Sequence, residues 1–135
     1  FKTSGGKYVA PGPIENTMKA SQFIEQIMVI GEGEKHASAL IVPAFEHIRI
    51  WAKDQGLNCN SNEDICSNQE VIKAISSDVK GYNEHFGQTE QIKKFELVNC
   101  EWSVEGGELT PTMKPKRKPI LEKYDHLVKK IYNES

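Results

Sequence analysis

The sequence predicts an α+β domain in which a small sheet, with an N-terminal β-hairpin and about three central strands, is covered by helices. Short β-branched runs bounded by glycine and proline are typical of strands, and they occur between segments with the apolar spacing of helices. At 135 residues the chain is long enough for a single core and too short for two. We therefore expect one domain.

A hairpin and a short helix are expected first. Phe1–Ser4 and Lys7–Val9 flank Gly5-Gly6, a pair that predicts a two-residue turn with positive φ. Pro13 suits a first helical turn, and the apolar spacing that follows predicts a helix over about residues 12–21.

Two strands and a helix follow. Residues 23–30 and 36–42 are β-branched and apolar, and the loop between them predicts an antiparallel pair. Pro43 ends the second strand. The buried stripe of Phe45, Ile48 and Ala52 then predicts a helix that ends near Gly56.

The second half contains the clearest helical periodicity. Residues 58–62 are expected to form a loop, and Ser67-Asn68-Gln69-Glu70 is typical of a capping box that opens a helix running to Phe86. Residues 92–98 predict a third central strand, and residues 101–107 a loop. A last helix is expected from Lys116 or Pro119 to Tyr132.

Composition restricts the class of protein. The chain is 38% hydrophobic and 27% charged, which is ordinary for a soluble globular domain. The longest apolar run is far short of the roughly 20 residues of a membrane span, and no signal peptide is recognisable. Three cysteines without a CxxC pair indicate free thiols in a reducing compartment. We expect a cytoplasmic location.

Charge is distributed unevenly along the chain. Residues 114–130 contain seven Lys or Arg and two acidic residues, which gives this segment a charge of +5. The net charge of the chain is −2, so the other residues together carry −7. Such a basic segment on an acidic body predicts an anionic ligand bound at one place. The alternative is a solvated basic linker that leads into a helix.

Lys114 is the most distinctive residue of this segment. Pro111 and Pro115 restrict the backbone on either side of it and predict an extended, stiff loop. A lysine ammonium suits a point contact with a phosphate or carboxylate oxygen, whereas Arg117 suits a bidentate contact. No spacing of histidines or cysteines predicts a metal site.

Two stretches together resemble the small C-terminal domain of acyl-adenylate-forming enzymes. The first matches the hairpin motif G-x-x-V-x-P-x-x-I-E at Gly6, Val9, Pro11, Ile14 and Glu15. The second, Thr110-Pro111-Thr112-Met113-Lys114, resembles the catalytic-lysine motif of the family. The commoner form ends Ser-Gly-Lys, from which Met113 departs, but Thr-Pro-Thr-x-Lys followed by Lys-Arg is similar to the long-chain fatty acid–CoA ligase branch.

The resemblance implies that residues 1–135 are the single, mobile C-terminal domain of an ATP-dependent, AMP-forming ligase. Its large N-terminal domain, which holds ATP, Mg²⁺ and the fatty acid, would be missing. The start at Phe1, without a methionine, fits a piece of a longer polypeptide. The isolated domain is expected to fold without catalysing the reaction.

The resemblance also implies roles for individual residues. Lys114 would stabilise charge during adenylation. The Gly5-Gly6 hairpin would then lie against the pantetheine arm of CoA, where a side chain would obstruct the contact. Lys7 and Tyr8 are candidate neighbours of that arm. Lys116 and Arg117 are candidates for binding CoA or ATP phosphates, with interdomain salt bridges or plain solvation as alternatives.

Two other functions are carried as alternatives. One is an adenylating enzyme that passes its acyl group to a carrier protein. The other is a free-standing module whose basic segment binds nucleic acid or an acidic partner. The few aromatic residues in residues 109–119 argue against base stacking, so nucleic acid is not the expected partner. Peripheral association of the parent enzyme with a membrane is left open.

Overall fold

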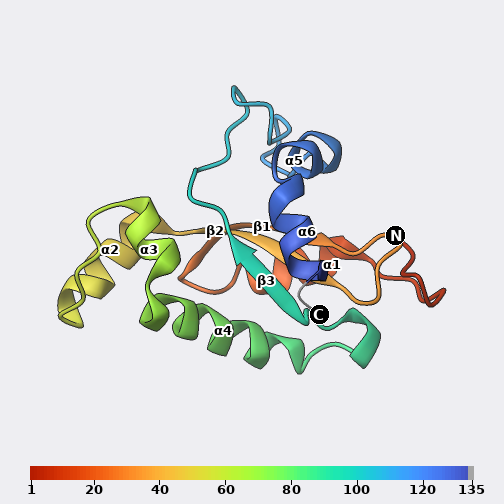
Figure 1. Ribbon diagram of the computed structural model, residues 1–135, viewed down its shortest axis with the longest axis horizontal. Helices are drawn as coiled ribbons and strands as arrows, with labels where there is room; N and C mark the ends of the chain where they lie inside the picture. Colours follow the sequence, from red (N-terminus) through yellow and green to blue (C-terminus); the bar gives the residue numbers. More distant parts are fainter. Residues whose placement is uncertain (134–135) are drawn as a thin grey trace.

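The computed structural model describes residues 1–133, and within them a three-stranded sheet forms the centre of an α+β domain (Figure 1). The strands are β1 (Ile24–Ile30), β2 (Ser38–Pro43) and β3 (Lys94–Leu97), in the spatial order β1-β2-β3. β1 and β2 are antiparallel, as predicted, and β3 lies parallel to β2. The strand order places β3 at an edge of the sheet. It is the third predicted strand, and it is shorter than the expected residues 92–98.

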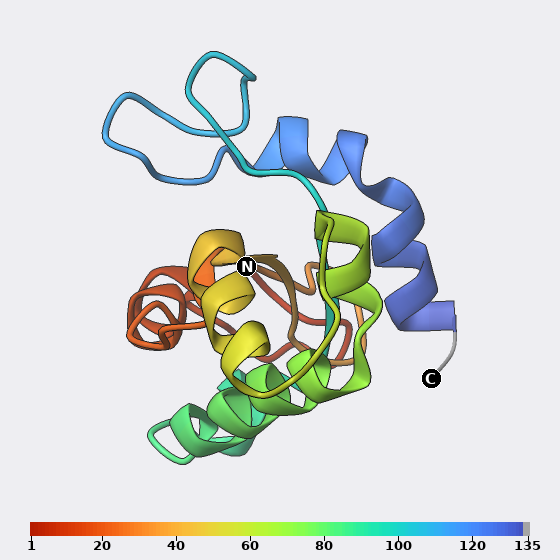
Figure 2. The ribbon, with the colours of Figure 1, turned by 90° about the vertical axis from the view of Figure 1, so that its left-hand side faces the viewer.

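Helices cover both faces of the sheet. They are α1 (Pro11–Met18), α2 (Phe45–Asp54), α3 (Asn62–Ser67), α4 (Gln69–Asn83), α5 (Arg117–Lys123) and α6 (Asp125–Asn133). α6 packs on β2 and β3 from one side, and α1 packs on β1 and α4 from the other (Figures 1 and 2). Of the helices in residues 1–133, none has the length and apolar character needed to cross a membrane.

The core lies between these layers. All six residues of β2 are buried, and β1 exposes only Glu25. Ile14 from α1 and Ile75 from α4 are completely buried beside them. Strands covered on both faces need a nearly continuous apolar run, which explains why residues 27–30 contain no polar side chain.

The N-terminal hairpin is present, but its turn is longer than predicted. The Thr3 N–H donates to the Lys7 carbonyl at 2.9 Å, and the Gly6 N–H donates to the Thr3 carbonyl at 3.0 Å. Ser4, Gly5 and Gly6 thus form a three-residue loop, in which Gly6 (φ +80°) is in the left-handed region and Gly5 is not. The Thr3 hydroxyl also accepts a bond from the Lys7 N–H, which stabilises the wider turn.

The capping residue of α4 is Asn68, not Ser67. The Asn68 side chain accepts hydrogen bonds from the N–H groups of Glu70 and Val71. Ser67 instead ends α3, where its hydroxyl donates to the Glu63 carbonyl. The predicted capping box is therefore wrong by one residue, because a short helix that the sequence did not predict occupies residues 62–67.

The last helix is divided in two. Tyr124 adopts a non-helical conformation (φ −111°, ψ 26°) between α5 and α6, where the sequence predicted one continuous helix. Its ring is buried and lies 6.3 Å from that of Trp102, measured between ring centroids. Burial of the Tyr124 ring against Trp102, which is distant in sequence, favours the break between the helices. The apolar spacing of residues 116–132 does not predict this break, because it does not depend on Trp102.

Candidate functional site

Lys114 lies on a closed bend, which we call the lysine loop (residues 109–116). The Thr110 N–H donates to the Lys114 carbonyl at 2.8 Å, and the Met113 N–H donates to the Thr110 carbonyl at 2.7 Å. Leu109, at the start of the loop, is completely buried, whereas Lys114 is exposed. The predicted stiffness therefore comes from a hydrogen-bonded turn as well as from the prolines, and the loop is not simply extended.

Met113 has a backbone conformation that is unusual for its residue type. Its φ of 67° is the only positive value at a non-glycine residue in residues 1–133. An unbranched side chain tolerates this left-handed region at a cost, whereas glycine adopts it freely. The bend explains physically why a glycine suits this position in the commoner Ser-Gly-Lys form of the motif.

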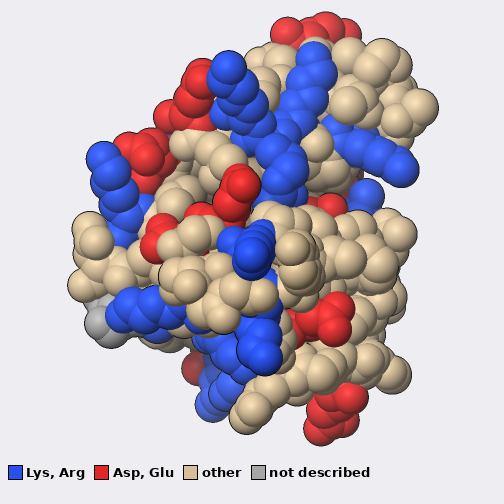
Figure 3. Space-filling model, turned by 90° about the vertical axis from the view of Figure 1, so that its right-hand side faces the viewer, with Lys and Arg blue, Asp and Glu red and all other residues tan. Residues whose placement is uncertain are grey.

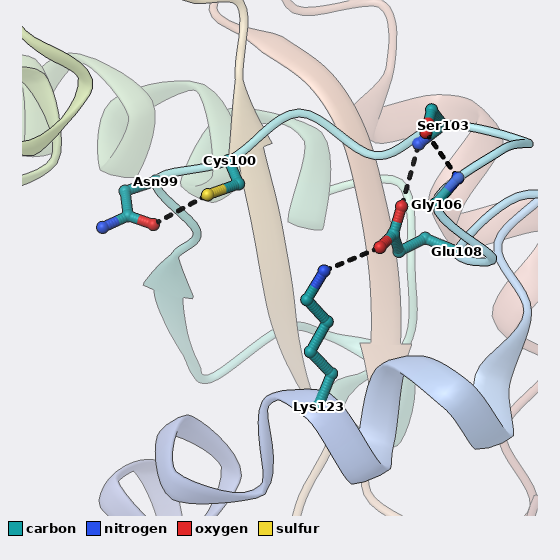
Figure 4. A network of polar contacts seen from close by, with 6 residues as sticks. All are labelled: Asn99, Cys100, Ser103, Gly106, Glu108 and Lys123. Carbon is teal, nitrogen blue, oxygen red and sulfur yellow. Dashed lines mark hydrogen bonds and ion pairs between the residues drawn. The ribbon is translucent and has the colours of Figure 1, made fainter.

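Glu108 anchors the base of the lysine loop (Figure 4). Its buried carboxylate accepts bonds from the Ser103 N–H at 3.0 Å and from the Lys123 ammonium at 2.8 Å. Its carbonyl accepts a bond from the Lys116 N–H at 2.7 Å. The hydrogen bond from Lys123 is the main cause that lowers the pKa of Glu108, so the carboxylate is ionised and joins the loop to α5.

The segment between β3 and α5 projects from the body of the domain. Figure 2 shows it rising above the sheet and forming two loops before it enters α5. The lysine loop belongs to this projecting segment.

The glycine hairpin is also fully accessible. Gly5, Gly6 and Lys7 are exposed, and Tyr8 is 76% exposed with the Lys2 ammonium 5.4 Å from the centre of its ring. A Cβ atom on Gly5 would approach nothing closer than 4.0 Å within the domain. The fold itself therefore does not require glycine at position 5.

A basic hollow of about 360 Å³ opens beside this hairpin. Gly5 and Lys7 of the hairpin line it. The rest of the lining consists of three basic residues, Lys35, His36 and Lys93, and three polar residues, Thr3, Gln88 and Thr89. The Lys93 ammonium donates to the Gln88 carbonyl at 2.8 Å. The face that carries the hairpin displays many Lys and Arg side chains (Figure 3). No motif in the sequence marks Lys35, His36 or Lys93 for this place, because separate segments bring them to the hairpin.

Arg117 lies at the start of α5 and makes contacts within the domain. Its guanidinium donates to the Val29 carbonyl, lies 3.7 Å from the Glu15 carboxylate, and stands 5.7 Å from the centre of the Phe1 ring. Lys116, by contrast, is exposed. The phosphate-binding role for these two residues stays a prediction, although the guanidinium of Arg117 already has partners.

Lys114 and the glycine hairpin occupy separate parts of the surface. In Figure 1 the lysine loop lies in the upper part of the molecule and the hairpin at its right-hand edge. Neither feature is turned into the core. Both features are therefore exposed, on different parts of the surface.

The cysteines offer no comparable site. Cys59, Cys66 and Cys100 are free thiols, as predicted. Burial raises the pKa of Cys66 to about 11, which disfavours the nucleophilic thiolate.

The residues just described can be compared with those of known proteins. A family model for the AMP-binding enzyme C-terminal domain matches residues 2–135. The chain belongs to this family. The match includes both the glycine hairpin and the lysine loop, and the AMP-binding enzyme C-terminal domain is the α+β domain that the sequence resemblance predicted.

Curated relatives of this AMP-binding C-terminal domain include long-chain-fatty-acid–CoA ligases. Human long-chain-fatty-acid–CoA ligase 1 is 38% identical over 127 residues, which is 92% of this chain and 18% of the relative. Long-chain-fatty-acid–CoA ligase FadD15 of Mycobacterium tuberculosis is 33% identical over 132 residues, 97% of this chain and 22% of the relative. The chain thus spans about a fifth of the length of these relatives.

Solved structures share the fold of this AMP-binding C-terminal domain. The adenylation domain of a carboxylate reductase from Mycobacterium chelonae has a TM-score of 0.80 and 20% identity, and the match covers 98% of this chain and 19% of that one. The A-PCP didomain of carboxylic acid reductase from Segniliparus rugosus has a TM-score of 0.77 and 19% identity, over 99% of this chain and 17% of that one.

Proposed function

We propose that this chain is the C-terminal domain of an ATP-dependent, AMP-forming long-chain fatty acid–CoA ligase. The observation that carries the proposal is the exposed Lys114 on a closed loop, in a chain whose relatives are named long-chain-fatty-acid–CoA ligases. The rest of the enzyme, including the sites for ATP and fatty acid, would lie in a larger N-terminal domain.

Lys114 serves the first half-reaction in this proposal. The fatty acid carboxylate attacks the α-phosphorus of ATP, an acyl–phosphate bond forms, and pyrophosphate leaves. Negative charge on the oxygens around phosphorus is stabilised by the Lys114 ammonium, a compact point charge held by its loop. Its exposure supports this role, because the lysine must reach into a site on another domain.

The glycine hairpin serves the second half-reaction. The CoA thiolate attacks the acyl carbonyl of the adenylate, a thioester forms, and AMP leaves. Gly5 supports a role beside the pantetheine arm, because the fold does not need a glycine there. The hollow with Lys7, Lys35 and Lys93 offers cations for the phosphates of CoA.

The two half-reactions require two orientations of the domain. Lys114 and the hairpin lie on separate parts of the surface, so one active site on the large domain cannot face both at once. A rotation of the C-terminal domain between the steps resolves this geometry. Mg²⁺ would bind with ATP in the large domain, as the resemblance to the family implies.

Replacement of Lys114 by alanine in the full-length enzyme tests the proposal. We expect adenylation, measured as pyrophosphate release with fatty acid and ATP, to fall by about a hundred- to thousandfold. Conversion of supplied acyl-AMP and CoA to acyl-CoA should be retained. Lys80→Ala, on the exposed side of α4, is the matched control. Equal loss of both half-reactions would contradict the assigned role.

The acceptor is tested with the same enzyme. Free CoA should accept the acyl group, and transfer only to a carrier protein would overturn the ligase assignment. The 135-residue chain alone should form no acyl-CoA from ATP, fatty acid and CoA.

A further inference from the structure

Thr110 joins the two sides of the lysine loop through three of its own polar groups. Its N–H donates to the Lys114 carbonyl at 2.8 Å, and its carbonyl accepts from the Met113 N–H at 2.7 Å. Its hydroxyl oxygen accepts a hydrogen bond from the Lys114 N–H at 3.1 Å. Both backbone groups of Lys114 are therefore bonded to the same residue, and one of these two bonds depends on the Thr110 side chain.

A second hydroxyl extends this arrangement. The Thr110 and Thr112 hydroxyl oxygens are 3.1 Å apart. Because the Thr110 oxygen accepts from the Lys114 N–H, its own hydrogen is available for donation to Thr112. A serine at position 110 retains both contacts, whereas a valine of nearly the same shape loses both.

Met113 shows why these bonds are needed. Its backbone is in the left-handed region at φ 67°, which disfavours an L-residue unless its surroundings impose it. The Met113 side chain is 50% exposed, so packing in the core does not impose the conformation. The hydrogen bonds to Thr110 span the bend itself, and the bond from the Lys116 N–H to the Glu108 carbonyl closes the base of the loop. Without them, the chain at positions 113 and 114 is free to return to an unstrained conformation.

We propose that Thr110 is a positioning residue for Lys114. It holds the backbone on either side of the lysine so that the ammonium leaves the loop in a single direction, with less conformational freedom to lose during adenylation. This inference rests on the proposed function of Lys114. Thr110 itself is not assigned a contact with substrate.

Two pairs of variants in the full-length enzyme test this inference. Thr110→Val should lower kcat for adenylation by about five- to tenfold, the effect of losing the hydrogen bond that holds the Lys114 N–H, with KM for ATP unchanged. Thr110→Ser should retain the rate. Met113→Val should also lower the rate, because a β-branched residue resists positive φ, and Met113→Gly should retain it. Thioester formation from supplied acyl-AMP should be unchanged in all four.

Hydrogen exchange of the segment at residues 109–116 in the same enzyme provides a readout independent of activity. Exchange at Lys114 should accelerate in Thr110→Val and not in Thr110→Ser. An unchanged adenylation rate in Thr110→Val, or equal loss of both half-reactions, would overturn the inference. If Lys114→Ala leaves adenylation intact, the proposed function fails. If Lys114→Ala abolishes adenylation while Thr110→Val does not slow it, only the positioning role fails.

Discussion

Glu15 and Arg117, which come from opposite ends of the chain, hold the N–H and the carbonyl of the same residue, Val29. The Val29 N–H donates to the Glu15 carboxylate at 2.8 Å, and the Arg117 guanidinium donates to the Val29 carbonyl. β1 is an edge strand, so these polar groups have no partner strand on that side. The two side chains therefore close an edge that would otherwise be open to pairing with another chain.

Replacement of Arg117 should lower the free energy of unfolding by more than replacement of a residue in an exposed ion pair. We expect Arg117→Met to lower the free energy of unfolding by about 1–3 kcal/mol, because it removes a charged donor from a backbone carbonyl. Burial raises the pKa of Glu15, and loss of the nearby guanidinium should raise it further. Urea denaturation of the chain measures the effect. In the double variant with Glu15→Gln the two costs should be less than additive, and strict additivity would contradict the coupling.

The Glu108–Lys123 pair should make stability depend on pH at acid values. The pKa of Glu108 is lowered from 4.5 by its hydrogen bond from Lys123, so the folded state favours the ionised form. Its contribution is present above pH 4.5 and is lost as pH falls through the lower pKa of the folded state. Glu15, whose pKa is raised by burial, contributes with the opposite sign. The free energy of unfolding of Glu108→Gln should therefore fall less at acid pH than that of the unmodified chain.

The exposed Lys129–Asp125 pair is the control for this experiment. Its side chains are 68% and 58% exposed at a separation of 2.9 Å, so solvent screens their attraction. Asp125→Asn should leave the free energy of unfolding nearly unchanged. Thermal denaturation at several pH values compares the two variants. Equal acid profiles for Glu108→Gln and the unmodified chain would show that the Glu108–Lys123 pair does not act as described.

Asn68 should be worth more to stability than its neighbour Ser67. Asn68→Ala removes the side chain that accepts two N–H groups at the start of α4, and should lower the free energy of unfolding by about 1 kcal/mol. Ser67→Ala removes only a hydroxyl that donates to carbonyls of α3. Urea denaturation of both variants measures the difference, and a larger effect at Ser67 would restore the capping box predicted from the sequence.

Substitutions at Gly5 and Gly6 should distinguish an effect on domain stability from an effect on the reaction with CoA. Gly6 has φ +80°, so Gly6→Ala should cost about 1–2 kcal/mol of domain stability. Gly5→Ala should leave stability unchanged, because its Cβ would approach nothing closer than 4.0 Å. In the full-length enzyme Gly5→Ala should nevertheless slow thioester formation from acyl-AMP and spare adenylation. Normal thioester formation in a correctly folded Gly5→Ala enzyme would reject the contact with pantetheine.

Regular local patterns predicted most of the fold. The apolar stripes of residues 45–54 and 69–83 predicted α2 and α4, and the β-branched runs predicted the antiparallel pair β1–β2. In each of these elements the spacing of apolar residues recurs along one continuous segment, so the pattern can be recognised without knowing the rest of the fold. The break at Tyr124 lacks such a signal, because the aromatic side chain that it packs against, Trp102, lies far away in the sequence. The short α3 does have a local signal, the Ser61 hydroxyl that accepts from the Asp64 N–H, but it lies in a polar stretch that was expected to be a loop.

The sequence by itself predicted which residues would carry the chemistry: Lys114, which follows Thr110-Pro111-Thr112-Met113, and the glycine pair within the N-terminal motif. Only the tertiary structure decided how they are presented. Thr110 and Glu108 hold the lysine loop, Lys35 and Lys93 reach the hairpin from other segments, and the partners of Arg117 lie at the far end of the chain. The physical reason is that motif residues are adjacent along the backbone, whereas hydrogen-bond partners and charges are brought together only when the sheet and helices pack.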